Sequence, residues 1–258
     1  MISFTEITSK DNPVIKLAVK LQGSGRSRRE YGLFVIEGLR LCRDAAENGF
    51  KFEYLLFTSE ALEKHGETLE FLSMNSDKSQ MLSEAAFSKI SDTKTPQGII
   101  CICKNPNRTE KIKPKGRYIA LENLADPSNL GAISRTAEAL GISGLILSPD
   151  CCDPYSPKSL RASMGALLRL PIIRTTDFSD ALLKSRLALY SCVVSPDATS
   201  VTDVDFEDGC ISIIGNEANG LTEKMINIST PITIKMTGRA ESLNAAVAAS
   251  IVMWEMQR

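Results

Sequence analysis

Apolar and polar positions alternate along the chain in a way that predicts β-strands separated by amphipathic helices. Near the middle, residues 117–122 form an apolar run, 126–129 a polar turn, and 130–140 a stretch with apolar side chains at helical spacing. A glycine follows, and strand character resumes at 144–147. The pattern predicts one strand, helix, strand unit, with Asn129 as the N-cap of its helix.

The same alternation continues on both sides of this unit and predicts two α/β domains. We expect domains at residues 1–104 and 117–258, joined by a basic, proline-containing linker at 105–116. Repeated alternation of strand and helix favours a mainly parallel sheet in the C-terminal domain. In such sheets ligands bind beyond the carboxyl ends of the strands. The predicted strands centre on residues 34–36, 52–57, 99–103, 119, 145, 172, 190–194, 211–214 and 232–234.

Composition and sequence pattern argue against several classes of function. No run of eighteen apolar residues occurs and the N-terminus lacks the pattern of a signal peptide, so we expect a cytoplasmic protein that does not contact membranes. Seven cysteines are an odd number, which argues against a disulfide framework. Cys151 and Cys152 are adjacent and the single histidine, His65, is far away in sequence. We therefore predict neither a metal site nor a histidine-dependent hydrolase.

The charge is unevenly distributed. A net charge of −1 argues against a protein that coats nucleic acid indiscriminately. The first 29 residues nevertheless hold six basic side chains and two acidic ones. This arm is either solvated and partly mobile or a contact for phosphates. The candidates for phosphate contact are Lys16, Arg26, Arg28 and Arg29.

Two loops and one helix in the C-terminal half could hold a ligand. Gly215–Leu221 follows a predicted strand and 237–244 follows another, and the glycines permit close backbone approach. Each loop could equally be a turn that caps the next helix. Arg135 lies opposite an apolar stripe, so it is either a solvated side chain or, beside small residues, a contact for a ligand or another chain. Phosphate loops of the GxGxxG and GxxxxGK[ST] types are absent from the sequence.

Three ordered motifs resemble one family. They are NLGAISRTAEALG from Asn129, IIGNEANGL from Ile213 and ITIKMTGRAESLNAAVAASI from Ile232, and RASMGALLRLP from Arg161 fits between them. Together they resemble the SpoU/TrmH family of SPOUT-class RNA ribose methyltransferases. The N-terminal half is similar to the α/β RNA-binding domain, itself like a ribosomal protein, that precedes the catalytic domain in many members.

The resemblance implies a fold and an activity. It implies a C-terminal SPOUT domain with a parallel sheet and a deep trefoil knot, S-adenosylmethionine as cofactor, and a homodimer formed through that domain. The implied reaction is methylation of a ribose 2′-hydroxyl in RNA. Large-subunit (23S) ribosomal RNA is the expected substrate, with transfer RNA second. A relative that binds RNA without catalysis is the competing class.

The resemblance also assigns residues by motif position. The catalytic set is Asn129, Arg135, Glu217, Ser242 and Asn244. Gly215, Ile234 and Leu243 match donor-contacting positions, and Asn216, Gly220 and Met236 of the same loops are assigned to the donor site with them.

The family proposal makes the arginine at position 135 a general base. Neutralising a guanidinium at pH 7 costs roughly 8 kcal/mol. We therefore expect Arg135 mainly to orient the RNA phosphate and to stabilise the developing alkoxide.

Overall fold

The structure is a computed structural model that describes residues 2–106 and 111–258. Within these residues the chain forms two compact units, one of residues 2–106 with 155–160 and one of 111–154 with 161–258. Residues 107–110 of the predicted linker lie outside the described residues. The domain limits given above stay a prediction. Nothing in the sequence indicated that residues 155–160 belong to the N-terminal unit.

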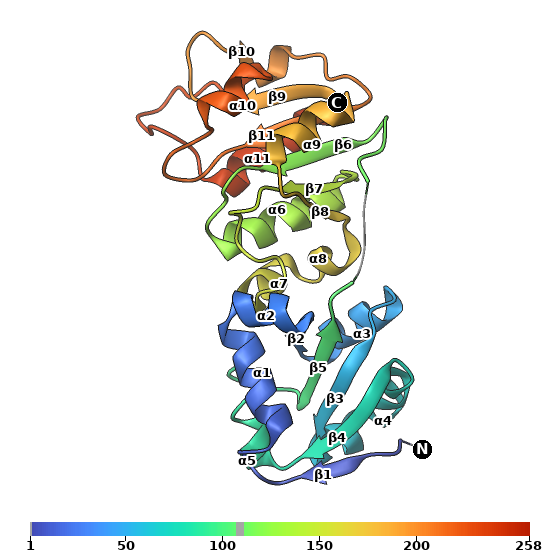
Figure 1. The fold of residues 1–258 in the computed structure, drawn as a ribbon. Helices are drawn as coiled ribbons and strands as arrows, with labels where there is room; N and C mark the ends of the chain where they lie inside the picture. The colour runs from blue at the N-terminus through green and yellow to red at the C-terminus, as the bar shows by residue number, and fades with distance from the viewer. Residues whose placement is uncertain (1, 107–110) are drawn as a thin grey trace. The chain divides into compact units, whose positions relative to one another are not determined.

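The N-terminal unit is a mixed five-stranded sheet with helices (Figure 1). Its strand order is β1-β4-β3-β5-β2, and β5 runs antiparallel to both of its neighbours. The apolar side of α1 packs Ile15 and Leu21 into a core with Val35, Leu56 and Ile100 of the sheet. The elements are β1 (Thr5–Ile7), α1 (Pro13–Gly23), α2 (Gly25–Tyr31), β2 (Leu33–Glu37), α3 (Leu39–Glu47), β3 (Phe52–Thr58), α4 (Ser59–Ser73), β4 (Ser76–Leu82), α5 (Glu84–Phe87) and β5 (Ile99–Lys104).

The C-terminal unit contains a seven-stranded sheet in which every described pairing is parallel, which confirms the predicted sheet type. The strand order is β10-β12-β9-β11-β6-β7-β8, so β9, β11 and β12 are neighbours although they are separated in sequence (Figure 1). The elements are β6 (Arg117–Leu121), α6 (Pro127–Ala139), β7 (Gly144–Leu147), α8 (Ala166–Arg169), β8 (Ile172–Arg174), α9 (Phe178–Ser185), β9 (Ala188–Cys192), β10 (Thr199–Ser200), a 3-10 turn η1 (Val201–Asp203), β11 (Cys210–Ile214), α10 (Glu223–Asn227), β12 (Thr230–Thr233) and α11 (Ala245–Met256). Helix α7 (Pro157–Ser163) begins in the N-terminal unit and ends in this one.

Helix α6 begins earlier than the sequence pattern predicts. Asp126, not Asn129, is its N-cap, and the Asp126 carboxylate accepts a 2.9 Å hydrogen bond from the Ser128 amide. The prediction of Asn129 as the cap was therefore wrong. Pro127 explains the difference, because proline fits the first helical position, where no amide hydrogen is needed. As a result Asn129 lies inside the first turn, and its side chain is available for other contacts.

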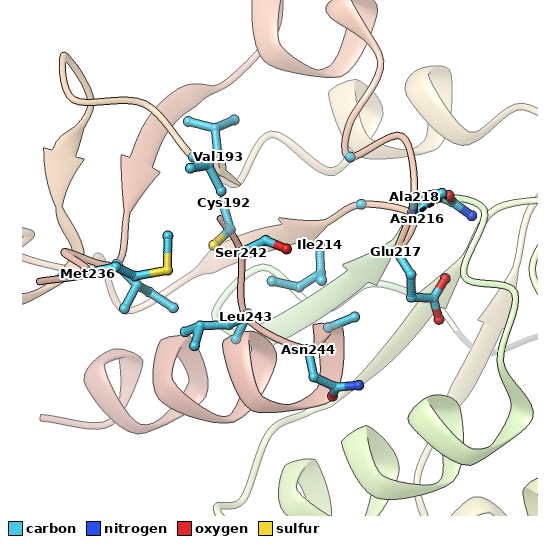
Figure 2. Close-up of a pocket in the computed structure, with 16 residues that line it drawn as sticks. Cys192, Val193, Ile214, Asn216, Glu217, Ala218, Met236, Ser242, Leu243 and Asn244 are labelled. Carbon is cyan, nitrogen blue, oxygen red and sulfur yellow. Dashed lines mark hydrogen bonds between the residues drawn. The ribbon is translucent and has the colours of Figure 1, made fainter. Parts of the chain in front are cut away.

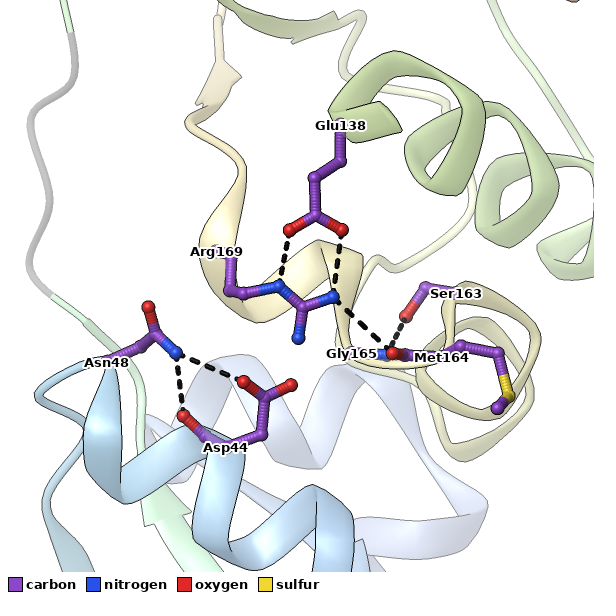
Figure 3. Close-up of polar contacts among 7 residues, drawn as sticks. All are labelled: Asp44, Asn48, Glu138, Ser163, Met164, Gly165 and Arg169. Atoms are coloured by element: carbon purple, nitrogen blue, oxygen red, sulfur yellow. Dashed lines mark hydrogen bonds and ion pairs between the residues drawn. The ribbon is translucent and has the colours of Figure 1, made fainter. Parts of the chain in front are cut away.

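Two close contacts fix the position of α6. A Cβ built on Gly131 would lie 2.4 Å from the Cβ of Ala162, so only glycine permits this approach to α7. Further along, the Glu138 carboxylate forms a two-pronged ion pair with Arg169 of α8 (Figure 3). Hydrogen bonds from Arg169 lower the pKa of Glu138 despite the opposing effect of burial. These contacts position the first turn of α6 and, with it, Asn129.

Helix α11 packs against α6 and against strands β6 and β11. It buries Ala249, Val252 and Met253, whereas Val247 is 48% exposed and Trp254 is 59% exposed. Part of the apolar surface of this helix is therefore exposed within one chain. No helix among the residues that the structure describes is long and apolar enough to cross a membrane.

Candidate functional site

The carboxyl ends of three neighbouring strands surround a cavity of about 410 Å³ (Figure 2). Strands β12, β9 and β11 run in the same direction, so the segments that follow them meet at one edge of the sheet. The two loops selected from the sequence are among these segments. The lining residues are Cys192, Val193, Val194, Ile214, Gly215, Asn216, Glu217, Ala218, Gly220, Ile234, Met236, Ser242, Leu243, Asn244, Ala245 and Ala248.

Most of the predicted site residues line this cavity. All six residues assigned to the donor do so, and so do three of the catalytic set, Glu217, Ser242 and Asn244. Met236 and Leu243 give one side of the cavity an apolar character, while Glu217 lies on the opposite side in Figure 2. Segments from distant parts of the sequence therefore form a single site.

Three predicted polar residues form one hydrogen-bonded chain. The side-chain amide of Asn129 donates to a carboxylate oxygen of Glu217 over 2.9 Å. The side-chain amide of Asn244 donates to the side-chain oxygen of Asn129 over 3.0 Å. Glu217 also accepts hydrogen bonds from the amides of Ala125 and Asp126, both at 3.2 Å. One residue of each motif thus joins this network.

The network favours an ionised Glu217. Partial burial raises the pKa of this carboxyl, but hydrogen bonds from Asn129 and from backbone amides outweigh it and leave the pKa below the ordinary value of 4.5. The negative charge is therefore retained at neutral pH, at the rim of the cavity.

Helix α11 begins directly at the site. The Asn244 side-chain oxygen accepts from the amides of Ala246 at 2.9 Å and Val247 at 3.3 Å, so Asn244 is the N-cap. The alternative that Ser242 only caps this helix is wrong. Ser242 is exposed and contributes to the cavity wall.

Arg135 is not brought into the cavity of the single chain. Its side chain is exposed on α6, and it is absent from the cavity lining. Ala132, one turn earlier, lines a separate groove with side chains of α11. The structure therefore separates the predicted arginine from the residues expected to act with it.

The basic arm is helical, and its four candidates differ. Lys16, Arg26 and Arg29 are exposed on α1 and α2, as a phosphate contact requires. Arg28 is only 6% exposed, and its guanidinium donates to the carbonyls of Leu21 at 2.6 Å and Gln22 at 3.2 Å. We correct its assignment from RNA contact to structural residue, because its donors are used to hold the end of α1.

Sequence reasoning missed part of the cavity wall. Cys192, the last residue of β9, lines the site together with Val193 and Val194, which follow it. Burial raises the pKa of the Cys192 thiol to about 11, so the thiol is protonated at neutral pH. The sequence does contain a signal for these residues, because it predicts a strand at 190–194 and ligands bind beyond the ends of strands in parallel sheets.

Among the described residues there is no cluster of His, Cys, Asp and Glu suited to a metal ion.

The fold and the cavity define an α/β protein that holds a small molecule at the carboxyl edge of a parallel sheet. Residues 116–254 match the SpoU rRNA Methylase family, and residues 12–101 match the MRM3-like substrate binding domain. The chain belongs to the SpoU rRNA methylase family, which confirms the resemblance drawn from its motifs.

Relatives match over nearly the whole chain. An uncharacterized tRNA/rRNA methyltransferase of Synechocystis is 32% identical over 98% of this chain and 93% of its own length. The Bacillus subtilis 23S rRNA (guanosine(2553)-2′-O)-methyltransferase RlmP is 28% identical over 98% of this chain and 99% of its own length. The AdoMet-bound rRNA methyltransferase from Sinorhizobium meliloti superposes with a TM-score of 0.88 at 28% identity, covering 98% of this chain and 97% of that one.

Proposed function

We propose that this protein transfers the methyl group of S-adenosylmethionine to a ribose 2′-hydroxyl of RNA, with 23S ribosomal RNA as the substrate. The observation that carries the proposal is that the second and third motifs line one cavity and that Asn129 of the first motif is hydrogen-bonded to both of them, through Glu217 and Asn244. The Bacillus subtilis relative is named as a 23S rRNA 2′-O-methyltransferase, and the Sinorhizobium meliloti structure holds AdoMet. Both support this substrate and this donor.

The residues present fit S-adenosylmethionine. Ile234, Met236 and Leu243 supply apolar surface for an adenine ring, and loop amides supply hydrogen bonds. The donor carries a positive sulfonium, and the described lining contains the Glu217 carboxylate but neither lysine nor arginine. The cavity of about 410 Å³ lies in the usual range for ligand pockets.

The chain's own residues align the reacting groups. When bound, S-adenosylmethionine would supply a methyl group to the ribose oxygen: the carbon–sulfur bond would break as the oxygen–carbon bond forms, the neutral thioether would leave, and the hydroxyl proton would pass to water. The Asn129 amide is oriented by Glu217 on one side and Asn244 on the other, so it is held ready to orient the ribose or its phosphate. Arg135 remains the residue that we propose to orient the RNA phosphate and to stabilise the developing alkoxide.

A homodimer explains how Arg135 joins the site. Ala132 of α6 and Val247, Ile251 and Trp254 of α11 line an apolar groove on the surface of one chain. A second copy that covered this groove would bury exposed apolar area, and Arg135, on the next turn after Ala132, would lie at the edge of the interface. We propose that each arginine completes the partner's site.

The oligomeric state tests this arrangement. Trp254→Glu places a charge in the groove and is expected to give a monomer by light scattering, with loss of methylation but a retained fold. Leu183→Glu is the matched control, because Leu183 of α9 is 54% exposed and absent from the groove lining. A dimeric Trp254→Glu protein would count against this interface.

The N-terminal unit is the proposed RNA-binding domain, with Lys16, Arg26 and Arg29 as contacts to phosphates. The deep trefoil knot, the domain limits and the cytoplasmic location are proposals as well.

One assay tests the activity. The protein is incubated with labelled S-adenosylmethionine and unmodified 23S rRNA or transfer RNA, and the modified nucleotide is mapped. We expect a 2′-O-methyl group on the 23S rRNA. If only transfer RNA were methylated on a ribose, transfer RNA would replace 23S rRNA as the proposed substrate. Methylation of a base would refute the proposal. A protein that shows no thermal shift with the donor would be a non-catalytic relative.

A further inference from the structure

Glu122 is a buried ionisable side chain with no part in the reaction proposed above. It follows the last residue of β6, is 7% exposed, and lies at the carboxyl edge of the sheet. An ionised carboxylate is rarely buried unless hydrogen bonds compensate for the lost hydration. Its partners therefore indicate what it does.

Both partners of Glu122 are the ends of one loop. The Glu122 amide donates to the carbonyl of Ile214, the last residue of β11, over 2.9 Å. Its carboxylate accepts from the amide and from the hydroxyl of Thr222, each at 2.8 Å. The segment between these partners, residues 215–221, contains five of the cavity-lining residues. A single residue thus ties together the beginning and the end of this donor loop.

The next residue strengthens the attachment. Asn123 has a left-handed backbone, with φ at 55°, and its carbonyl accepts a 2.7 Å hydrogen bond from the Asn216 side chain. The Asn216 side-chain oxygen in turn accepts from the amides of Ala218 and Asn219 at 2.9 and 3.1 Å. The tip of the donor loop is therefore held as well. Directly after the loop, at Thr222, the contact is made by the carboxylate of Glu122.

We propose that Glu122 is a positioning residue that clamps the donor loop in the conformation that binds S-adenosylmethionine. The inference rests on the proposed function, since it names the ligand of that site. Without the clamp, residues 215–221 would have to be ordered when the donor binds, and the affinity would fall by that cost. The catalytic step, which depends on groups held by Asn129, would change little once the donor is bound.

The proposal predicts a division between binding and catalysis. Glu122→Ala removes both hydrogen bonds of the clamp, and we expect it to raise the donor Kd about tenfold, measured by calorimetry. Thr222→Val removes only the hydroxyl hydrogen bond, and we expect a smaller rise, of about threefold. At saturating donor and RNA, kcat should stay within about threefold of wild type. Thr222→Ser keeps the amide, the hydroxyl and the helix cap, so it should retain the wild-type Kd.

A double variant and a control exclude a merely structural effect. Glu122→Ala with Thr222→Val should bind the donor no more weakly than Glu122→Ala alone, because the hydrogen bond lost in Thr222→Val is one of the two lost in Glu122→Ala. Arg28→Met removes the hydrogen bonds to the carbonyls of Leu21 and Gln22 in the N-terminal unit, and it should lower Tm without changing the donor Kd. A Kd within about twofold of wild type in both folded single variants would overturn the clamp, as would additive effects.

The experiment distinguishes the two levels of inference. If wild-type protein fails to bind S-adenosylmethionine, the proposed function fails. If wild type binds and the Glu122 and Thr222 variants bind equally well, only the clamp fails. Should Glu122→Ala not fold, Thr222→Val and Thr222→Ser decide the question, because Thr222 lies on the surface side of the same contact.

Discussion

Two sides of helix α6 differ in how far they are organised. In its first turn, Asn129 is buried and hydrogen-bonded to Glu217 and Asn244, so this polar network of the proposed donor side is formed within one chain. On another face of the same helix, Arg135 is exposed beside an apolar groove. The donor side is preorganised, whereas the RNA side requires RNA and, as we propose, a second copy.

This difference matches the chemistry of the two ligands. A small donor is bound most tightly by a cavity that already has the correct shape, because binding then does not have to order the protein. A ribosomal RNA segment is large and its phosphates are contacted by long, mobile basic side chains. Substitutions on the two sides should therefore change different measured quantities.

The largest expected effect is at Arg135. Arg135→Ala should lower kcat by about 100- to 1,000-fold, the usual loss when a group that stabilises developing charge is removed. The donor Kd should stay within about twofold, because Arg135 is absent from the cavity lining. Single-turnover methylation and calorimetry measure the two quantities separately.

Arg135→Lys is the sharper variant. Lysine keeps the charge but loses the two-pronged guanidinium geometry, so we expect at least a tenfold loss, to about the same extent at every pH. Full activity of this variant across the pH range would show that the guanidinium fork is irrelevant, and the proposed role of Arg135 would be withdrawn.

A second contrast of the same kind exists between adjacent arginines of α2. Arg28→Met should lower the free energy of unfolding by roughly 2 kcal/mol, because the Leu21 and Gln22 carbonyls lose a charged donor. Arg29→Met should leave stability unchanged, weaken RNA binding and reduce the salt dependence of binding by about one charge. Urea unfolding and filter binding at several salt concentrations measure the pair. Equal losses of stability would contradict the different roles.

The sequence predicted the sheet type well because parallel strands covered by helices are nearly continuous apolar runs, as at 211–214. It did not indicate β4, whose residues are mostly polar and only partly buried, so that strand has neither an apolar run nor a clear alternation. The two-residue strand β10 is too short to produce any pattern.

The site was predictable to the extent that its motifs are local. The resemblance of the motifs to the family, carried over position by position, identified nine cavity-lining residues, from Gly215 to Asn244. Burial was not predictable: Arg28 and Arg29 are equivalent in the sequence, but only the helical geometry turns Arg28 inward. The clamp at Glu122 depends on a contact with Thr222 across 100 positions, which no local pattern contains.

On the donor side, Asn244 has two roles that substitutions can separate. Asn244→Ala removes the N-cap of α11 and the hydrogen bond to Asn129, and it should cost about 1 kcal/mol of stability together with a loss of kcat. Asn244→Ser retains a capping oxygen but cannot donate an amide hydrogen to Asn129. We expect it to restore stability, measured by Tm, and not kcat. Recovery of both quantities would mean that the Asn129 contact has no function.

The smallest expected effect is the pH dependence of Glu217. Its pKa is lowered on folding, so its contribution to stability is complete above the ordinary value of 4.5 and is lost as the pH falls through the lower, folded-state pKa. Glu217→Gln has no charge to lose. The difference in urea midpoint between wild type and this variant should therefore shrink from about pH 6 to about pH 3.5. A difference that stayed constant over this range would show that the ionised carboxylate does not stabilise the network, and the donor side would then owe its order to the backbone contacts of the loop and to the Asn244 cap.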